Sequence, residues 1–555
     1  MCLLLIAFFG DNYNIKECRG WKTTKVLSAT RPLFLVVQKE LIIDVGNTQQ
    51  RLYLDPVNRI PGPKVGWFPL MGNYLEIIKN ESGEPHKYWA KQYGGIFVYH
   101  GPWNSPRVVV TDDVLLKQVL TSQEYDFIKT PEASKFLRRF LGDGLLTAEG
   151  EVHRHQRKML NPAFSVNAIR ALVPLMAIPG RMLRDKWLNM INQLDKNGNG
   201  INKKRVIVDE DNERKEEFTE IEISNDLSLA TLDVIGWAFG QDFKSLEFSG
   251  TPQQSKLSQA YLHIFSQDTS IMRILSFIFP ILNNFPTERN KKIRRDLKWL
   301  DEESKALVQA GIDRAASAAA NPDMKQNQPK DLLATMVDLI DEETGKGFTL
   351  EEMRNQCLTF MAAGHETTSV SLSWCLWLLA KNQKVQDELR AEINTLFTDD
   401  KDETIPTYDE INSLPLLNNV VRETLRLIPP VPTTTRITRV PVTLGSYVLP
   451  KGTRVFLSPI TNHHSIEIWG DDAEAFNPYR WEKQEKIGNA YQYIPFLAGG
   501  RQCIGYRFAL IEFKILLALL IKHIQYFEKP GFKVTKKQHV TLRPSPNMIL
   551  WMKQI

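Results

Sequence analysis

The stretch Phe496-Leu497-Ala498-Gly499-Gly500-Arg501-Gln502-Cys503-Ile504-Gly505 decides how this chain is interpreted, and an apolar run from about Tyr506 to Ile524 follows it. The apolar run predicts a helix whose first turn lies beside the cysteine. Free amides and the positive end of the helix dipole favour an anionic sulfur, so we expect a lowered pKa for Cys503. Gly499 and Gly500 permit a turn with positive φ that aims the sulfur away from its own backbone. This combination is typical of a thiolate held under a flat, metal-bearing ligand.

Three neighbours of Cys503 have roles in this interpretation. Gly505 leaves room for the flat ligand, Phe496 shields the sulfur from water, and Arg501 is placed to meet an anionic edge. The alternative is a buried, inert thiol, which is the usual state of a cysteine beside an apolar helix. The pattern F-x-x-G-x-R-x-C-x-G is far rarer than that. It resembles the haem-ligand loop of the cytochrome P450 family at every specified position, which implies that Cys503 is the axial iron ligand.

Composition limits the class of protein. With 555 residues and 43% hydrophobic content the chain can bury a large core, and no internal repeat or Gly/Ser linker divides it. We therefore expect an N-terminal extension over residues 1–59 and one haem domain over residues 60–555. The net charge of +5 is spread among interspersed acids and bases, which argues against a nucleic-acid interface. Five cysteines, an odd count, argue against a disulfide framework and confine cysteine chemistry to Cys503.

The N-terminal extension is apolar in places. The run from Met1 to Phe9 is too short to span a bilayer, and no basic region or cleavage site marks it as a signal peptide. We expect this segment either to lie on a membrane surface or to be a loosely ordered extension, and the sequence demonstrates no spanning anchor.

Helical periodicity dominates the middle of the chain and short strands flank it, so the fold class is mainly α with small β-sheets. This matches the cytochrome P450 fold, one large helical domain with a smaller β-rich part. Helical patterns run from about Ser165 to Leu396, and two polar inserts, Asp195 to Glu217 and Ala319 to Lys330, are expected to be solvated loops. The expected strands are Ile96 to Tyr99, Arg107 to Thr111, runs within Thr433 to Leu444, Ser446 to Leu449, and Thr453 to Leu457.

A second motif, Ala363-Gly364-His365-Glu366-Thr367-Thr368, interrupts an apolar helical run from about Gln356 to Ala380. Ala363 and Thr367 are four residues apart, so the hydroxyl can bond back to the carbonyl and open a small polar groove. The alternative is a buried helix whose hydroxyls only satisfy its own backbone. The motif resembles the family's oxygen-activation motif (A/G)-G-x-(D/E)-T-T. The resemblance implies that Thr367 and Glu366 organise proton delivery to dioxygen.

A third motif places Glu423 and Arg426 on one face of a helix that ends before Pro429. Its context resembles the family's buried ion network, whose third member would be Arg480. Tyr479 and Trp481 stand where the family usually has Glu and Phe. We expect this triad to be structural, holding the segment that carries Cys503.

Further cations resemble the family's haem-propionate contacts. His153 and Arg157 share a helix face as in the W-x-x-x-R pattern, with His153 at the usual Trp position, and Arg436 is preferred over Arg439 as another contact. The alternative for the first pair is a basic, exposed helix face.

The resemblance implies haem b (iron protoporphyrin IX), cleavage of dioxygen and insertion of one oxygen atom into a small apolar substrate. It also implies an external NADPH-cytochrome P450 reductase that docks near Arg157 and Lys158, and a location on the cytosolic face of the endoplasmic reticulum membrane. Two alternatives remain open: a haem-thiolate isomerase or dehydratase acting on peroxides, and a non-enzymatic haem-binding sensor. The substrate is not predicted. The expected pocket comprises the stretch from Asp126 to Leu146 together with Phe360, Ala363, Thr368, Val431 and Thr433.

Overall fold

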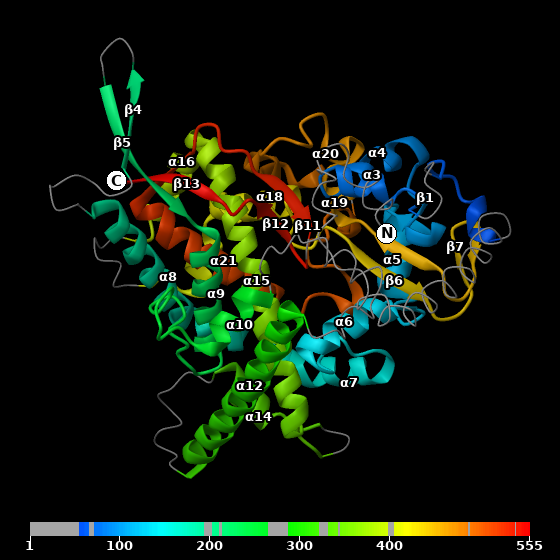
Figure 1. The fold of residues 1–555 in the computed structure, drawn as a ribbon, viewed down its shortest axis with the longest axis horizontal. Helices are drawn as coiled ribbons and strands as arrows, with labels where there is room; N and C mark the ends of the chain where they lie inside the picture. The colour runs from blue at the N-terminus through cyan, green and yellow to red at the C-terminus, as the bar shows by residue number, and fades with distance from the viewer. Residues whose placement is uncertain are drawn as a thin grey trace, which may run out of the picture.

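The computed structural model is mainly helical with small sheets, as predicted (Figure 1). It describes residues 55–65, 71–193, 203–209, 214–264, 287–320, 331–341, 345–397, 405–486, 489–538 and 540–555. Nearly all of the expected N-terminal extension, including the run from Met1 to Phe9, therefore lies outside the described residues. So does most of the expected loop from Ala319 to Lys330.

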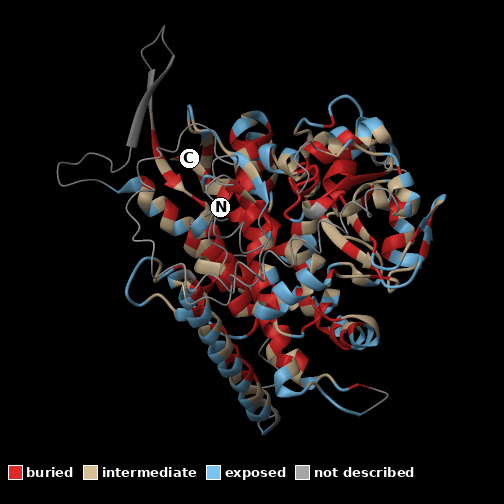
Figure 2. Ribbon diagram, turned by 45° about the vertical axis from the view of Figure 1, so that its right-hand side comes forward, coloured by how far each residue is buried: buried red, intermediate tan, exposed pale blue. Residues whose placement is uncertain are grey.

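Four long helices form the core, which is the most deeply buried part of the molecule in Figure 2. Helix α15 (Leu350–Lys381) packs against α9 (Ser224–Ala238), and α21 (Tyr506–His523) packs against α8 (Val166–Asn192). A capping box fixes the start of α15, because the Thr349 side chain and Glu352 satisfy each other's backbone amides. The remaining described α-helices are α3 (Tyr74–Lys79), α4 (Glu84–Tyr93), α5 (Asp113–Lys117), α6 (Pro131–Leu141), α7 (Gly150–Leu160), α10 (Lys256–Ile264), α12 (Glu288–Ala320), α14 (Leu332–Asp338), α16 (Gln383–Asn394), α17 (Tyr408–Ser413), α18 (Pro415–Leu427), α19 (Pro459–His463) and α20 (Ile466–Trp469).

The largest sheet has the order β1-β2-β9-β6-β3, in which β2 and β9 are parallel and the other neighbours antiparallel. The segment before it packs closely, because the Val98 amide donates to Pro61 O at 2.9 Å. A Cβ at Gly62 would lie 1.8 Å from the Val98 carbonyl oxygen, so this turn requires glycine. The strands of this sheet are β1 (Ile96–His100), β2 (Pro106–Val110), β3 (Phe127–Ile128), β6 (Thr434–Thr438) and β9 (Arg454–Leu457).

The second sheet, with order β10-β13-β5-β4, corrects one expectation. The charged insert expected to be a loop contains β4 (Lys203–Asp209) and β5 (Arg214–Glu222), a ribbon that extends from the body in Figure 1. Strand β5 pairs with β13 (Ile549–Gln554), and Phe218 at its base packs against Phe527 and Trp551. Charge alone predicted a loop here, but an edge ribbon also tolerates charged residues. The other strands are β10 (Ile524–Glu528), the pair β11 (Thr535–Gln538) and β12 (Leu542–Ser545), and the pair β7 (Val442–Leu444) and β8 (Tyr447–Leu449).

Within the described residues, α8 is the one helix long and apolar enough to cross a membrane. It contains Pro174 and Pro179, has ten buried residues and packs against α9 and α21. A core helix passes the same length and composition test, so α8 is weak support for a membrane span.

The β-rich part contains a histidine whose ring makes no hydrogen bond to the described residues. His86 of α4 is 4% exposed and stacks on Phe456 at 5.3 Å, with Trp89 and Tyr99 edge-on to its ring. Neither ring nitrogen has a hydrogen-bond partner in the part of the chain that the structure describes. Burial, with a smaller contribution from the Arg107 charge, lowers the pKa of His86 to about 4. The ring is therefore neutral in the folded protein near neutral pH.

We predict that His86→Phe reduces acid sensitivity. The unfolded chain binds a proton at this histidine more tightly than the folded chain, so wild-type stability falls as pH drops from about 6.5 towards about 4. By pH 5 this proton binding lowers the free energy of unfolding of the wild type by about 2 kcal/mol, and the phenylalanine variant should not show this loss. Denaturant unfolding at pH 7.5 and 5 measures the difference, with half-exposed His155→Phe as the control. Parallel losses in wild type and His86→Phe would contradict the prediction.

Candidate functional site

The Cys503 loop is shaped by contacts that demand its glycines. The Cys503 amide donates to Phe496 O at 2.9 Å, which closes the loop before α21 begins. Gly499 has φ +73°, and a Cβ there would lie 1.9 Å from the Leu120 carbonyl oxygen. A Cβ at Gly505 would meet nothing nearer than a ring carbon of Phe164 at 3.6 Å. The loop is thus tight behind the cysteine and open in front of it.

The pKa of Cys503 moves opposite to the sequence-based expectation. Burial raises it, and the Gly505 N–H hydrogen bond and the Arg157 charge offset the rise only in part. The side chain is nevertheless exposed, whereas Cys357 and Cys375 are buried thiols whose pKa burial raises to about 12. Cys503 is thus accessible although protein atoms surround it densely, which indicates that its sulfur faces a space inside the protein. The amides at the start of α21 lower the pKa of Cys503 by less than desolvation raises it.

Cations gather beside this loop. Arg501 forms an ion pair with Glu149, its side chain is 5% exposed, and its Nε has no acceptor among the described residues. Lys129, which the sequence did not single out, also binds Glu149, and burial with the Arg501 charge lowers the pKa of Lys129 to about 7. Burial followed by the Arg501 charge lowers the pKa of Arg436 to about 10. Glu149 balances only part of this positive charge.

His153 and Arg157 lie on α7 next to the same loop. Arg157 Nη1 donates to the Gln502 carbonyl, directly before Cys503, and its Nε donates to Asn161 at 3.1 Å. His153 is buried, with Nδ1 3.1 Å from the Tyr125 hydroxyl. Burial and the Arg501 charge lower the pKa of His153 to about 3, so its ring is neutral. His153 is therefore turned into the protein and Arg157 is half-buried, whereas Lys158 is exposed.

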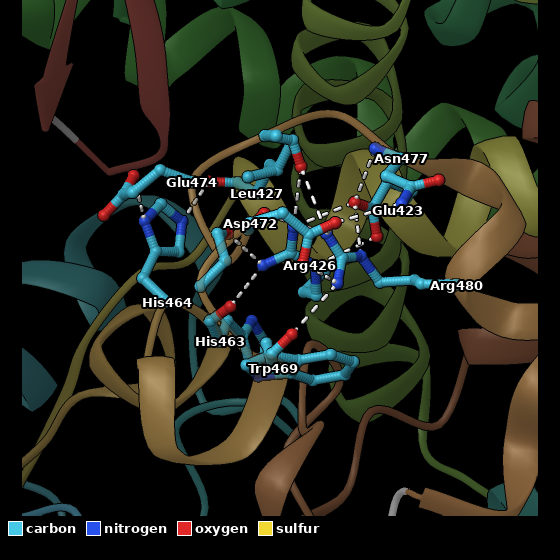
Figure 3. A network of polar contacts seen from close by, with 12 residues as sticks. Glu423, Arg426, Leu427, His463, His464, Trp469, Asp472, Glu474, Asn477 and Arg480 are labelled. Atoms are coloured by element: carbon cyan, nitrogen blue, oxygen red, sulfur yellow. Dashed lines mark hydrogen bonds and ion pairs between the residues drawn. The ribbon is translucent and has the colours of Figure 1, made fainter.

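The expected ion network on α18 is present (Figure 3), with Glu423 and Arg426 completely buried and Arg480 nearer the surface. Glu423 accepts from Arg426 Nε and Nη2 at 2.9 and 2.8 Å and from Arg480 Nε at 2.9 Å. Arg426 also donates to the carbonyls of His463 and Ala473, both at 2.6 Å. The network thereby ties α18 to the irregular segment that leads to Cys503.

The two departures from the family's usual residues have partners of their own. Trp481 Nε1 donates to Glu423 Oε2 at 3.0 Å and so adds a donor to the network. The Tyr479 hydroxyl donates to Glu388 on α16. Both substitutions attach the irregular segment to the helices by hydrogen bonds.

Helix α15 has one open patch. Ala363 is exposed and Thr367 half-buried, whereas most of their neighbours on α15 are buried. The Thr367 hydroxyl donates to Ala363 O at 2.8 Å, the back-bond expected from the sequence. Glu366 is buried and is bound by two residues that sequence reasoning missed, Thr541 and Arg543.

The residues expected to line the pocket differ in burial and in hydrogen-bond partners. Thr368 is buried and donates to Glu512 of α21 at 3.0 Å, so it connects two helices rather than lying beside Ala363. This removes it from the expected pocket, because Thr368 lies five residues after Ala363 and the two side chains point to different faces of the helix. Phe360 is buried against Phe164, Thr433 accepts from Gln538 at 2.9 Å, and Val431 is exposed.

A family model described as Cytochrome P450 matches residues 61–551. Cytochrome P450 monooxygenase 205 of Postia placenta is 32% identical, covering 88% of this chain and 90% of the relative. Cytochrome P450 monooxygenase sphH of Aspergillus fumigatus is 30% identical, covering 90% and 88%. Cytokinin hydroxylase of Arabidopsis thaliana is 28% identical, covering 84% and 82%.

The chain belongs to the cytochrome P450 family. The family and the names of these relatives make it a cytochrome P450 monooxygenase, an enzyme that depends on haem iron, dioxygen and a redox partner.

The residues present fit a haem in this cytochrome P450. Cys503 offers an accessible sulfur, and the open side of Gly505 leaves space for a flat ring. The unpaired Nε of Arg501 and the excess charge around Lys129 and Arg436 match the carboxylates on a haem rim. Positive charge thus lies where the cofactor is negative.

Some of these residues had a sequence signal and others had none. Trp481 and Tyr479 were visible as departures from a motif. No sequence pattern includes Lys129, Thr541 or Arg543. Lys129 lies far along the chain from the Cys503 loop, and Thr541 and Arg543 lie far from Glu366. Only the tertiary fold identifies them.

We predict that Glu423→Gln destabilises the protein by about 3–5 kcal/mol, because it leaves the buried Arg426 without a counter-charge, whereas Arg480 keeps Asp472. Denaturant unfolding measures the loss, and haem retained after gel filtration should fall with it. The control is Glu132→Gln, which breaks a partly exposed pair with Arg454 and should cost less than about 1 kcal/mol. Equal losses in the two variants would contradict a structural role for the network.

Proposed function

We propose that this enzyme uses haem b bound through the Cys503 thiolate to insert one atom of dioxygen into a small apolar substrate. The observation that carries the proposal is the accessible Cys503 sulfur bordered by excess positive charge. When bound, the haem would supply the cleavage of dioxygen. Residues 60–555 form the haem domain in this proposal.

The chain's own residues divide the remaining tasks. Phe496 and Gly499 shape the loop around the sulfur. Arg157 holds the carbonyl before Cys503 and so fixes the direction of the side chain. Arg501, Lys129, Arg436 and His153 hold the carboxylate rim, His153 as a neutral donor.

Thr367 and Glu366 manage protons at the open patch of α15. The Thr367 hydroxyl donates to Ala363 O and keeps its oxygen as an acceptor facing the open patch. Glu366, one residue earlier, is the acid that receives protons from solvent. Each turnover consumes two protons and two electrons, and the second oxygen atom leaves as water.

The electrons come from an NADPH-cytochrome P450 reductase in this proposal. Exposed Lys158 near the cysteine side of the molecule suits an acidic partner. We also propose the cytosolic face of the endoplasmic reticulum membrane as the location, with residues 1–59 as the membrane-associated segment. Ala363, Phe360, Val431 and Thr433 are the proposed substrate contacts.

We predict that Cys503→Ser abolishes the reduced carbon-monoxide absorbance band typical of thiolate haem, because a hydroxyl does not replace the anionic sulfur. The control is Cys357→Ser, which changes a thiol buried elsewhere in the core and should leave the band in place. Retention of the band by Cys503→Ser would rule out the ligand assignment.

We predict that Thr367→Ala lowers product formed per NADPH by at least about tenfold and raises peroxide release, since general acid–base assistance typically accelerates a reaction step roughly 10²–10⁴-fold. Thr359→Ala on the same helix, whose hydroxyl makes the same type of back-bond to Asn355, should stay coupled. Unchanged coupling in Thr367→Ala would remove Thr367 from the proton path. A peroxide isomerase or a haem sensor would show no NADPH-driven oxygen uptake in the wild type.

A further inference from the structure

Tyr125 contacts the buried histidine of α7 through its hydroxyl. The hydroxyl oxygen is 3.1 Å from Nδ1 of His153, and the two rings are tilted at 59° with their centres 6.0 Å apart. Tyr125 is half-buried, whereas His153 is 3% exposed. Among the described residues the Tyr125 hydroxyl is the one hydrogen-bond partner of the His153 ring, so Nε2 stays available for another group.

Two arginines determine how the Tyr125 hydroxyl is used. The Cζ atoms of Arg154 and Arg501 lie 4.1 and 5.2 Å from the centre of the Tyr125 ring. Burial raises the pKa of Tyr125, against a smaller lowering by a hydrogen bond from Arg154, so the hydroxyl keeps its proton. Because a guanidinium only donates, Arg154 uses the hydroxyl oxygen as an acceptor and leaves the O–H free to donate.

The neighbouring cations keep the His153 ring neutral. Burial, followed by the charges of Arg501 and Lys129, lowers the pKa of His153 to about 3. A neutral imidazole carries one proton, and the hydrogen bond made by one nitrogen decides which nitrogen holds it. A phenol is the more acidic donor of this pair and an imidazole nitrogen the more basic acceptor. Nδ1 therefore accepts from Tyr125, and the ring proton lies on Nε2.

We propose that Tyr125 is a positioning residue that, by donating to Nδ1, makes His153 an Nε2–H donor to a haem carboxylate. The inference rests on the proposed function, in which His153 contacts the carboxylate rim of the haem. The indole N–H of the family's usual Trp is permanent, whereas an imidazole needs a partner that keeps Nδ1 as the acceptor. A chain of donors thus runs from exposed Arg154 through Tyr125 and His153 towards the cofactor.

The direct test locates the proton of His153 by nuclear magnetic resonance. The sample is the full, haem-loaded chain with nitrogen-15 in its 10 histidines, in the diamagnetic ferrous carbon-monoxide form. We expect Nδ1 of His153 to resonate as an unprotonated nitrogen and Nε2 as a protonated one. The signals that disappear in His153→Trp assign the ring. A proton on Nδ1, alone or together with one on Nε2, would overturn the proposal without any change to Tyr125.

A second test measures haem transfer to apomyoglobin. Tyr125→Phe keeps the ring, and we expect it to lose haem at least about threefold faster than wild type, since Nδ1 is left buried without a donor. In a His153→Trp background the same change should have no effect, because the indole N–H does not depend on Tyr125. The matched control is Tyr491→Phe, which removes a hydroxyl 2.7 Å from Thr121 Oγ1 and should leave haem transfer unchanged. Equal effects of Tyr125→Phe in the two backgrounds, large or absent, would overturn the proposal.

His153→Phe separates failure of this inference from failure of the proposed function. If His153→Phe speeds haem loss but Tyr125→Phe does not, His153 contacts the cofactor and only the role of Tyr125 is wrong. If His153→Phe leaves haem loss unchanged, the contact assigned to His153 in the proposed function is wrong, and the inference about Tyr125 is overturned with it.

Discussion

A negatively charged sulfur inside a protein needs positive charge close to it, and the protein around Cys503 supplies too little. Burial raises the pKa of this thiol despite the Gly505 N–H and the Arg157 guanidinium. Haem iron is the missing charge in our account, because metal binding displaces the thiol proton and so couples cofactor binding to ionisation. Charge compensation is also needed at the site proposed for the haem carboxylates. Arg501, Lys129 and Arg436 repel one another there until carboxylates lie between them. Protein and cofactor are therefore complementary in charge at both places.

Such complementarity is useful only if the sulfur stays in one position. The buried network of Glu423, Arg426 and Arg480 is connected to the cysteine loop through His463, whose Nε2 accepts from the Ile494 amide at 3.0 Å. Leu497 then donates to Ile494 O at 3.0 Å, and the next residues form the turn at Gly499. A continuous chain of hydrogen bonds thus runs from α18 to the ligand loop. The net free energy of a buried ion network is uncertain, but its geometric constraint on that loop is direct.

Local motifs made much of this predictable from the sequence. The loop around Cys503, the back-bond of Thr367 and the α18 network each depend on residues with a distinctive spacing. The strand ribbon at β4 and β5 was missed because charge dominated the pattern. The direction of the Cys503 pKa was also missed, since the amount of burial is a tertiary property. No sequence pattern links Lys129, Thr541 or Arg543 to the site, and Thr541 and Arg543 lie 175 and 177 residues from their partner Glu366.

The most direct test of the central claim is the iron–sulfur stretching vibration of the purified, haem-loaded enzyme, measured by resonance Raman spectroscopy with natural and sulfur-34-labelled cysteine. Our account predicts a band that moves to lower frequency on labelling, because Cys503 sulfur is bonded to iron. A spectrum without any sulfur-sensitive band would contradict it.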